Sequence, residues 1–286
     1  MGCHYCGLGG NLEERLGDFH ALQLGGRRRA RESAVQTTTL SAMVYLDNSA
    51  GRLHDVLTRL GAQKNQQNLR QAWIAVLEPD PETPAVLLRS ISQVLVLAAT
   101  AEADIRALGD VAEDDADLLL GWVPGVGAGL GQAHLLEQTP NAVSQQVGLT
   151  HLQSLAFAAR ELHRWDPRPP LPESKRDEAA RLLADLLETL HAADDLDPAA
   201  RAMLIRHAAE LQYALNLAWV VGTEGVEDAL AGAVGTARFV MWKDPETGGK
   251  SSFKRFVETM SDLTTILVVG QTSLAIGTSV AGLLGS

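Results

Sequence analysis

Several groups of residues in this chain could bind a metal ion or take part in catalysis. Each such function requires a particular spacing of the residues along the sequence. Cys3 and Cys6 form a CxxC pair, and His4 and His20 are the nearest further candidates for zinc ligands. A structural zinc site usually needs two well-separated ligand pairs, and the sequence supplies one. We therefore expect no metal ion and no other cofactor here.

The same two cysteines are candidates for lipid attachment. The chain begins with Met-Gly, as N-myristoylated proteins do, but position 6 is Cys6 rather than serine or threonine. The myristoylation motif is therefore incomplete, and Cys3 and Cys6 stay as lipid-attachment candidates on a partial match.

A glycine-rich run from Pro124 to Gly131 invites comparison with phosphate-binding loops. It lacks the Lys-Ser/Thr ending of a P-loop, its glycine spacing differs from GxGxxG, and no strand precedes it. We expect a flexible loop between helices, or a place at which another helix packs closely.

Glu161, His163 and Asp166 lie close together in the segment ELHRWD. Their spacing differs from the HExxH motif of zinc hydrolases. We expect them at a helix C-terminus, where a histidine interacts favourably with the helix dipole. His207, beside an apolar stripe, is interpreted as a boundary histidine with one side in water.

Two acidic runs, 114–117 and 194–197, resemble calcium ligands only in composition. Both lack the glycine and the terminal glutamate of an EF-hand loop, so we expect them to cap and solvate helix ends. Since no group passes its spacing test, the sequence predicts a protein that is not an enzyme.

The amino-acid composition predicts the fold class and argues against one class of binding partner. With 46% hydrophobic and 21% charged residues and long periodic Leu- and Ala-rich segments, the chain is predicted to be all-α. The formal net charge of −11 argues against general nucleic-acid binding. Two cysteines allow no disulfide framework, which favours a reducing cytoplasm.

Helix start and stop signals divide the chain into segments. Pro84 and the pair Asp197-Pro198 mark helix starts, and Ser174 with Asp177 has the spacing of a capping box. We predict a multi-helix bundle of eight or nine helices with an apolar C-terminal helix. The expected parts are a flexible extension over 1–42, helical subdomains over 43–166 and 171–243, and an amphipathic segment with an apolar helix over 250–286.

About 40 residues of the second half resemble a segment of uncharacterised helical proteins from bacterial mobile-element and defence loci. The residues that carry the resemblance are Asp197-Pro198, Gly222, Gly225 and Gly235. It implies a helical fold and a bacterial source, and it transfers no functional residue.

The last 24 residues, from Leu263 to Ser286, carry no charge, and ten of them are Leu, Ile or Val. This length matches the roughly 20 residues with which a helix crosses a bilayer core. The small residues of this segment recur every four positions and so form one seam for helix association. The seam residues are Ser273, Gly277, Ala281 and Gly285.

The residues just before this segment have the pattern of a basic amphipathic helix with aromatic side chains, as found at membrane interfaces. The predicted membrane-interface residues are Lys250, Phe253, Lys254, Arg255 and Phe256.

Two functions fit the sequence. In the first, a cytoplasmic helical protein conditionally inserts its C-terminal helix in a membrane, such as the inner membrane, or anchors to it and self-associates, as a bacterial defence or toxin-like effector would. In the second, the same helix is buried in a soluble scaffold or interaction module. Both imply a homo-oligomer or a protein partner, and neither involves nucleic acid.

Overall fold

The computed structural model describes residues 47–63, 65–78, 84–108, 113–133, 135–167 and 169–267. All regular elements within these ranges are helices, so the predicted all-α fold is confirmed. They comprise the α-helices α2 to α12 and one 3-10 helix, η1, where the sequence predicted eight or nine helices. The predicted N-terminal extension and the seam of the apolar C-terminal helix lie outside the described residues.

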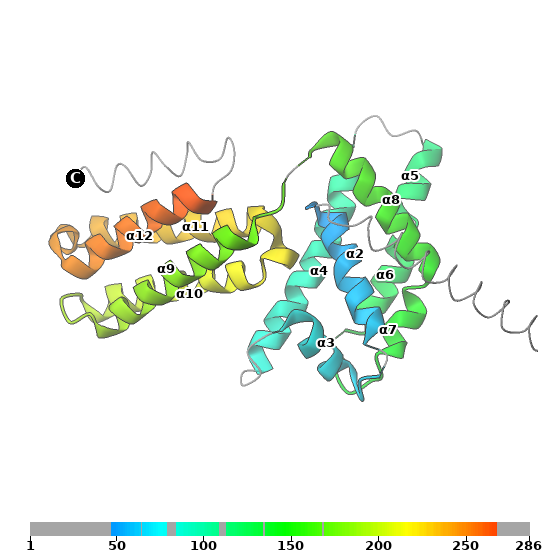
Figure 1. Ribbon diagram of the computed structural model, residues 1–286, viewed down its shortest axis with the longest axis horizontal. Helices are drawn as coiled ribbons and strands as arrows, with labels where there is room; N and C mark the ends of the chain where they lie inside the picture. The colour runs from blue at the N-terminus through cyan, green and yellow to red at the C-terminus, as the bar shows by residue number, and fades with distance from the viewer. Residues whose placement is uncertain are drawn as a thin grey trace, which may run out of the picture. The chain divides into compact units, whose positions relative to one another are not determined.

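The first hydrophobic core is formed mainly by helices α2 to α8 (Figure 1). Helix α2 lies at its centre and packs against α4 and α8. Leu53 of α2, Trp73, Trp122 and Leu155 are fully or almost fully buried there. The helices are α2 (Ser49–Ala62), α3 (Leu69–Leu77), α4 (Pro84–Arg106), α5 (Glu113–Leu120), α6 (Val123–Leu130), α7 (Asn141–Gln146) and α8 (Leu149–Trp165).

The second core belongs to a four-helix bundle in which α9 packs against α10 and α12, and α11 against α10 and α12 (Figure 1). The four helices run alternately up and down because short connections join them, as in other antiparallel bundles. They are α9 (Glu173–Ala192), α10 (Pro198–Asn216), α11 (Ala218–Lys243) and α12 (Ser251–Leu267), and η1 (Pro245–Gly249) joins the last two.

Polar side chains fix several helix starts. The side chains of Asn48 and Asn68 accept hydrogen bonds from the first-turn amides of α2 and α3. Asp197 accepts from the amides of Ala199 and Ala200, and Pro198 follows it as the first helical residue, as the sequence predicted. Each such cap satisfies amides that have no partner within the helix.

The predicted capping box of Ser174 and Asp177 is wrong. Helix α9 begins one residue earlier, at Glu173, after Pro172, and no side chain caps it. Ser174 therefore lies inside the first turn, where its own backbone is already helical, and it cannot occupy the cap position.

The glycine-rich run is helix α6 and not a flexible loop, so that expectation is corrected. Its glycines allow close helix packing, which was the other interpretation. A Cβ atom on Gly125 would collide with the ring of His151, and one on Gly129 would lie 2.7 Å from a Val147 methyl group. Small residues at these positions let α7 and α8 approach the α6 backbone.

Buried His54 gives the first core a predicted pH dependence. Burial lowers the pKa of His54 below 6.5, and the charge of Asp55 opposes this shift. Below pH 6.5 the unfolded chain binds a proton that the folded chain resists, so stability falls as the pH falls. We expect the free energy of unfolding to drop by up to about 1.4 kcal/mol per pH unit.

Urea unfolding at pH 7.5 and 5.5 measures this loss in the wild-type chain and in His54→Leu. The variant removes the titrating group and should lose less stability between the two pH values. An identical loss in both proteins would contradict the assignment to His54.

Candidate functional site

Helix α12 is the described part of the segment that the sequence singles out, and its apolar face lies inside the bundle. Phe253 is 2% exposed and Phe256 is fully buried. The buried face continues to the end of the helix. Its apolar members are Phe253, Phe256, Val257, Met260, Leu263 and Leu267.

The predicted membrane-interface residues thus fall into two groups. Phe253 and Phe256 pack in the core, whereas Lys250, Lys254 and Arg255 are exposed. The two rings can meet a membrane only if α12 leaves the bundle, so their interfacial role stays a prediction. The seam residues Ser273, Gly277, Ala281 and Gly285, and the lipid-attachment candidates Cys3 and Cys6, lie outside the described residues.

The start of α12 is held by a residue of another connection. Asp195, between α9 and α10, accepts hydrogen bonds from the Ser252 amide at 3.1 Å and from the Ser251 hydroxyl at 2.9 Å. Hydrogen bonds from Ser252 and then Ser251 lower the pKa of Asp195 from 3.8 to about 2. Its stabilising effect is therefore present above pH 3.8 and is lost as the pH falls toward 2.

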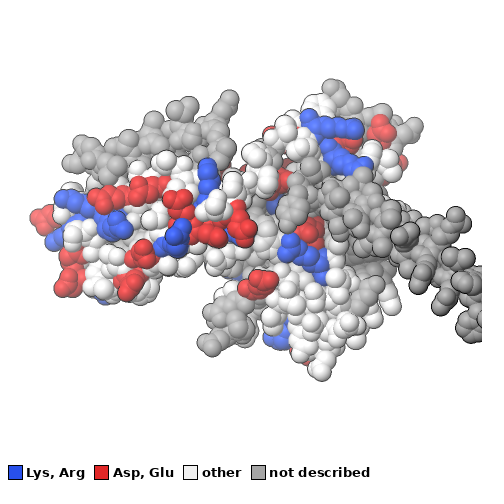
Figure 2. All heavy atoms as spheres, in the orientation of Figure 1, with Lys and Arg blue, Asp and Glu red and all other residues white. Residues whose placement is uncertain are grey.

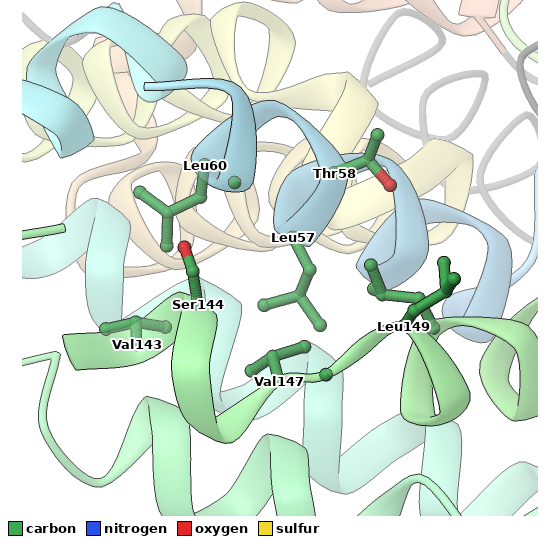
Figure 3. A pocket seen from close by; sticks show the side chains of 10 residues that line it. Leu57, Thr58, Leu60, Val143, Ser144, Val147 and Leu149 are labelled. Carbon is green, nitrogen blue, oxygen red and sulfur yellow. The ribbon is translucent and has the colours of Figure 1, made fainter. Parts of the chain in front are cut away.

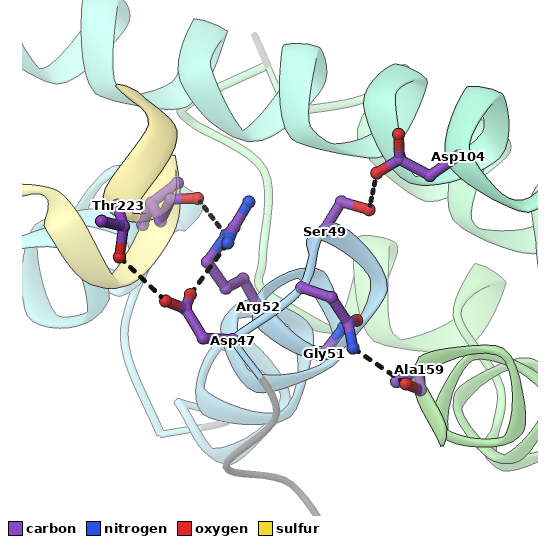
Figure 4. Close-up of polar contacts among 9 residues, drawn as sticks. Asp47, Ser49, Gly51, Arg52, Asp104, Ala159 and Thr223 are labelled. Atoms are coloured by element: carbon purple, nitrogen blue, oxygen red, sulfur yellow. Dashed lines mark hydrogen bonds and ion pairs between the residues drawn. The ribbon is translucent and has the colours of Figure 1, made fainter. Parts of the chain in front are cut away.

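A buried polar junction connects α2 with the start of α11 (Figure 4). The guanidinium of Arg52 donates to the Val220 carbonyl at 3.1 Å and to the Asp47 carboxylate at 2.8 Å. Asp47 also accepts from the Thr223 hydroxyl at 3.2 Å. The side chains of Arg52 and Asp47 are 9% and 10% exposed. The junction therefore ties α2 to the start of α11 through largely desolvated polar groups. Helix α11 contributes Val220 to the first core and its residues from Val226 onward to the second.

Gly222 completes the junction, because its φ of 74° and ψ of 177° break α11 at this residue. Residues other than glycine rarely adopt this conformation. A Cβ atom at this position would also overlap the guanidinium of Arg52. The backbone break and the contact with Arg52 both require glycine.

We expect Gly222→Ala to lower the free energy of unfolding by about 1–3 kcal/mol through backbone strain alone, with a further loss from displacement of Arg52. Gly235→Ala is the matched control, since Gly235 lies within α11 and has open space around it. The control should stabilise the helix by about 0.5–1 kcal/mol. Denaturant unfolding measures both variants, and a Gly222→Ala protein as stable as the wild type would contradict this account.

Glu161, His163 and His207 make local contacts in the described part of the chain. Glu161 pairs with Arg164 at 2.6 Å, and His163 lies in the last turn of α8, as predicted for a helix end. His207 is 26% exposed and lies 3.2 Å from Glu210. Within the described ranges, no three His, Cys, Asp or Glu side chains are grouped to hold a metal ion.

A groove between α2 and the α7–α8 segment is apolar (Figure 3). Its volume is about 270 Å³, and its polar side chains are those of Thr58 and Ser144. Leu57, Val147 and Leu149 supply much of the remaining wall. The groove therefore offers no acid, base or charge with which to act on a substrate.

Helix α4 is the one helix in the described part of the chain that is long and apolar enough to cross a membrane, with a mean hydropathy of 1.5. One face of its apolar middle lies in the core, where Val94 is fully buried, but Leu95 is 44% and Val96 58% exposed on the other. A core helix of a soluble protein passes the same test, so α4 alone does not indicate a membrane protein.

Comparisons with known proteins identify no family. No family model matches the chain, and it has no significant match among curated proteins or solved structures. The function must therefore be argued from the residues themselves.

Proposed function

We propose that the chain is a non-enzymatic, cytoplasmic helical protein that binds a membrane conditionally through α12 and the segment after it, and that self-associates there. The observation that carries the proposal is the position of α12. This amphipathic helix has its apolar face in the bundle, and it leads into a segment without charge.

Energetics make the release of α12 conditional. Six large apolar side chains of α12 lie in the bundle core. Exposing them to water would cost on the order of 10 kcal/mol. A bilayer interface gives the same side chains an apolar environment again, so a membrane offsets this cost. Release also uncovers α9 and α11, and self-association then covers these faces.

A pair of cap variants tests whether α12 is the part that moves. Asp195→Ala removes the cap of α12 and should destabilise its docked state by about 1 kcal/mol. We expect about fivefold more of the full chain to float with lipid vesicles. Asp197→Ala is the matched control, because it removes a similar cap from α10 and leaves α12 capped.

Equal flotation of the two cap variants would contradict the proposal.

Val269→Asp places a charge in the uncharged segment and should reduce flotation and dye leakage from vesicles. The leakage measurement addresses the more specific version of the proposal, a bacterial defence or toxin-like effector at the inner membrane.

The complete burial of Phe256 favours a second function, a soluble scaffold or interaction module in which α12 stays docked. Deletion of 268–286 separates the two functions. Leu263 and Leu267 belong to the core and must be kept. A scaffold in which this segment is buried would misfold or aggregate without it, whereas our proposal predicts a stable fold and the loss of vesicle binding.

A further inference from the structure

The end of the bundle where η1 joins α11 to α12 carries two exposed aromatic rings. Trp242 is 78% exposed and Phe239 is 47% exposed. Their ring centroids lie 6.0 Å apart on neighbouring turns of α11. Large aromatic side chains this exposed contribute nothing to the core of the bundle.

Basic residues share this end. Lys243 closes α11, while Lys250 and Lys254 lie at the start of α12, and all three are exposed. Only seven residues, Asp244, η1 and Lys250, separate the two helices, so the lysines lie at one end of the bundle. Figure 2 shows basic side chains next to acidic ones at one end of the bundle. We call Phe239, Trp242, Lys243, Lys250 and Lys254 the α11–α12 end.

Local charge at the α11–α12 end differs in sign from that of the chain. Residues 243–255 contain four basic and two acidic side chains, whereas the whole chain has a net charge of −11. Of the nearby carboxylates, Asp244 accepts hydrogen bonds from Glu246 and Thr247, and Asp195 caps α12. Glu246 is exposed. Asp194 and Asp197, in the α9–α10 connection that holds the start of α12, are also exposed, so the attraction for an anionic surface comes from the lysines that lie near the two rings.

We propose that the α11–α12 end is a binding surface for an anionic phospholipid bilayer. Tryptophan and phenylalanine enter the headgroup region of bilayers, and lysines beside them attract anionic lipids. This inference rests on the proposed function and gives its first step, because binding here brings the start of α12 to the lipid before the helix leaves the bundle.

Flotation of the full chain with two kinds of vesicle tests the surface. One kind is phosphatidylcholine alone, and the other contains about 30% phosphatidylglycerol. The wild type should favour the anionic vesicles, and the preference should weaken at high salt. Lys250→Gln with Lys254→Gln should lower binding to anionic vesicles by about 10- to 30-fold. Lys175→Gln with Arg181→Gln on α9 is the charge-matched control and should change binding by less than about threefold.

Tryptophan quenching by brominated lipid reports the contact itself. Wild-type protein should lose fluorescence on brominated anionic vesicles, and most of that loss should disappear in Trp242→Phe but persist in Trp165→Phe, where the replaced ring is 58% exposed on α8. Equal binding to both vesicles, or unchanged quenching in Trp242→Phe, would overturn the inference. If vesicle binding depends on the α11–α12 end but is unchanged by Asp195→Ala, this binding surface is supported and the release of α12 is refuted.

Discussion

Phe256→Ala is expected to lower the free energy of unfolding of the bundle by about 3–5 kcal/mol, the usual cost of truncating a fully buried phenylalanine. Phe256 is 0% exposed and lies among the apolar side chains of α9, α11 and α12. Because docking of α12 and stability of the bundle depend on the same contacts, the variant should also bind vesicles more readily.

Phe239→Ala is the control for Phe256→Ala, since it removes a ring of the same size from an exposed position of the same bundle. We expect it to change stability by less than about 0.5 kcal/mol. Urea unfolding followed by circular dichroism measures both variants. Similar losses from the two substitutions would show that α12 is not docked as described.

Arg52→Ala is expected to cost about 3–5 kcal/mol, because it leaves a buried carboxylate without its partner. Asp47 would keep only the hydrogen bond from Thr223, and the Val220 carbonyl would lose its donor. The junction ties α2 of the first core to α11, the helix that continues into the second core, so its loss should also separate the unfolding transitions of the two cores in a calorimetric scan.

Arg106→Ala is the control for Arg52→Ala. Arg106 pairs with Glu102 four residues earlier on α4 and is 60% exposed, and such a pair contributes about 0.3–0.5 kcal/mol. If Arg52→Ala were as mild as this control, the junction would not hold the two cores together. A single, unchanged transition in Arg52→Ala would contradict the same claim.

Helix positions followed from the sequence wherever the signal was local. The Asp197-Pro198 start predicted α10, because a helix cap acts within a few residues. For the glycine run the sequence left open a flexible loop or close helix packing, and the structure shows packing, because His151 and Val147 need the space next to α6. That requirement comes from residues more than fifteen positions away.

The junction was invisible in the sequence because its partners are far apart. Arg52 donates a hydrogen bond to Val220, which lies 168 positions away in the sequence. Neither local segment has a pattern that predicts this contact. Nothing in the sequence predicted the close contact between Gly222 and Arg52 either. The amphipathic pattern of residues 250–257 is also ambiguous, because the same spacing of aromatic residues fits a helix at a membrane interface and a helix packed in a protein core. The structure shows that core packing uses Phe253 and Phe256.

The central claim is that α12 leaves the bundle when the protein meets a membrane. Amide hydrogen exchange of the full chain, with and without anionic vesicles, tests it most directly. Leu183, Leu186 and Leu190 of α9 lie in the core to which α12 contributes. The account predicts that amides of α9 exchange faster on vesicles, while those of α2 and α8 keep their protection. Vesicle-bound protein in which α9 keeps its full protection would contradict the account.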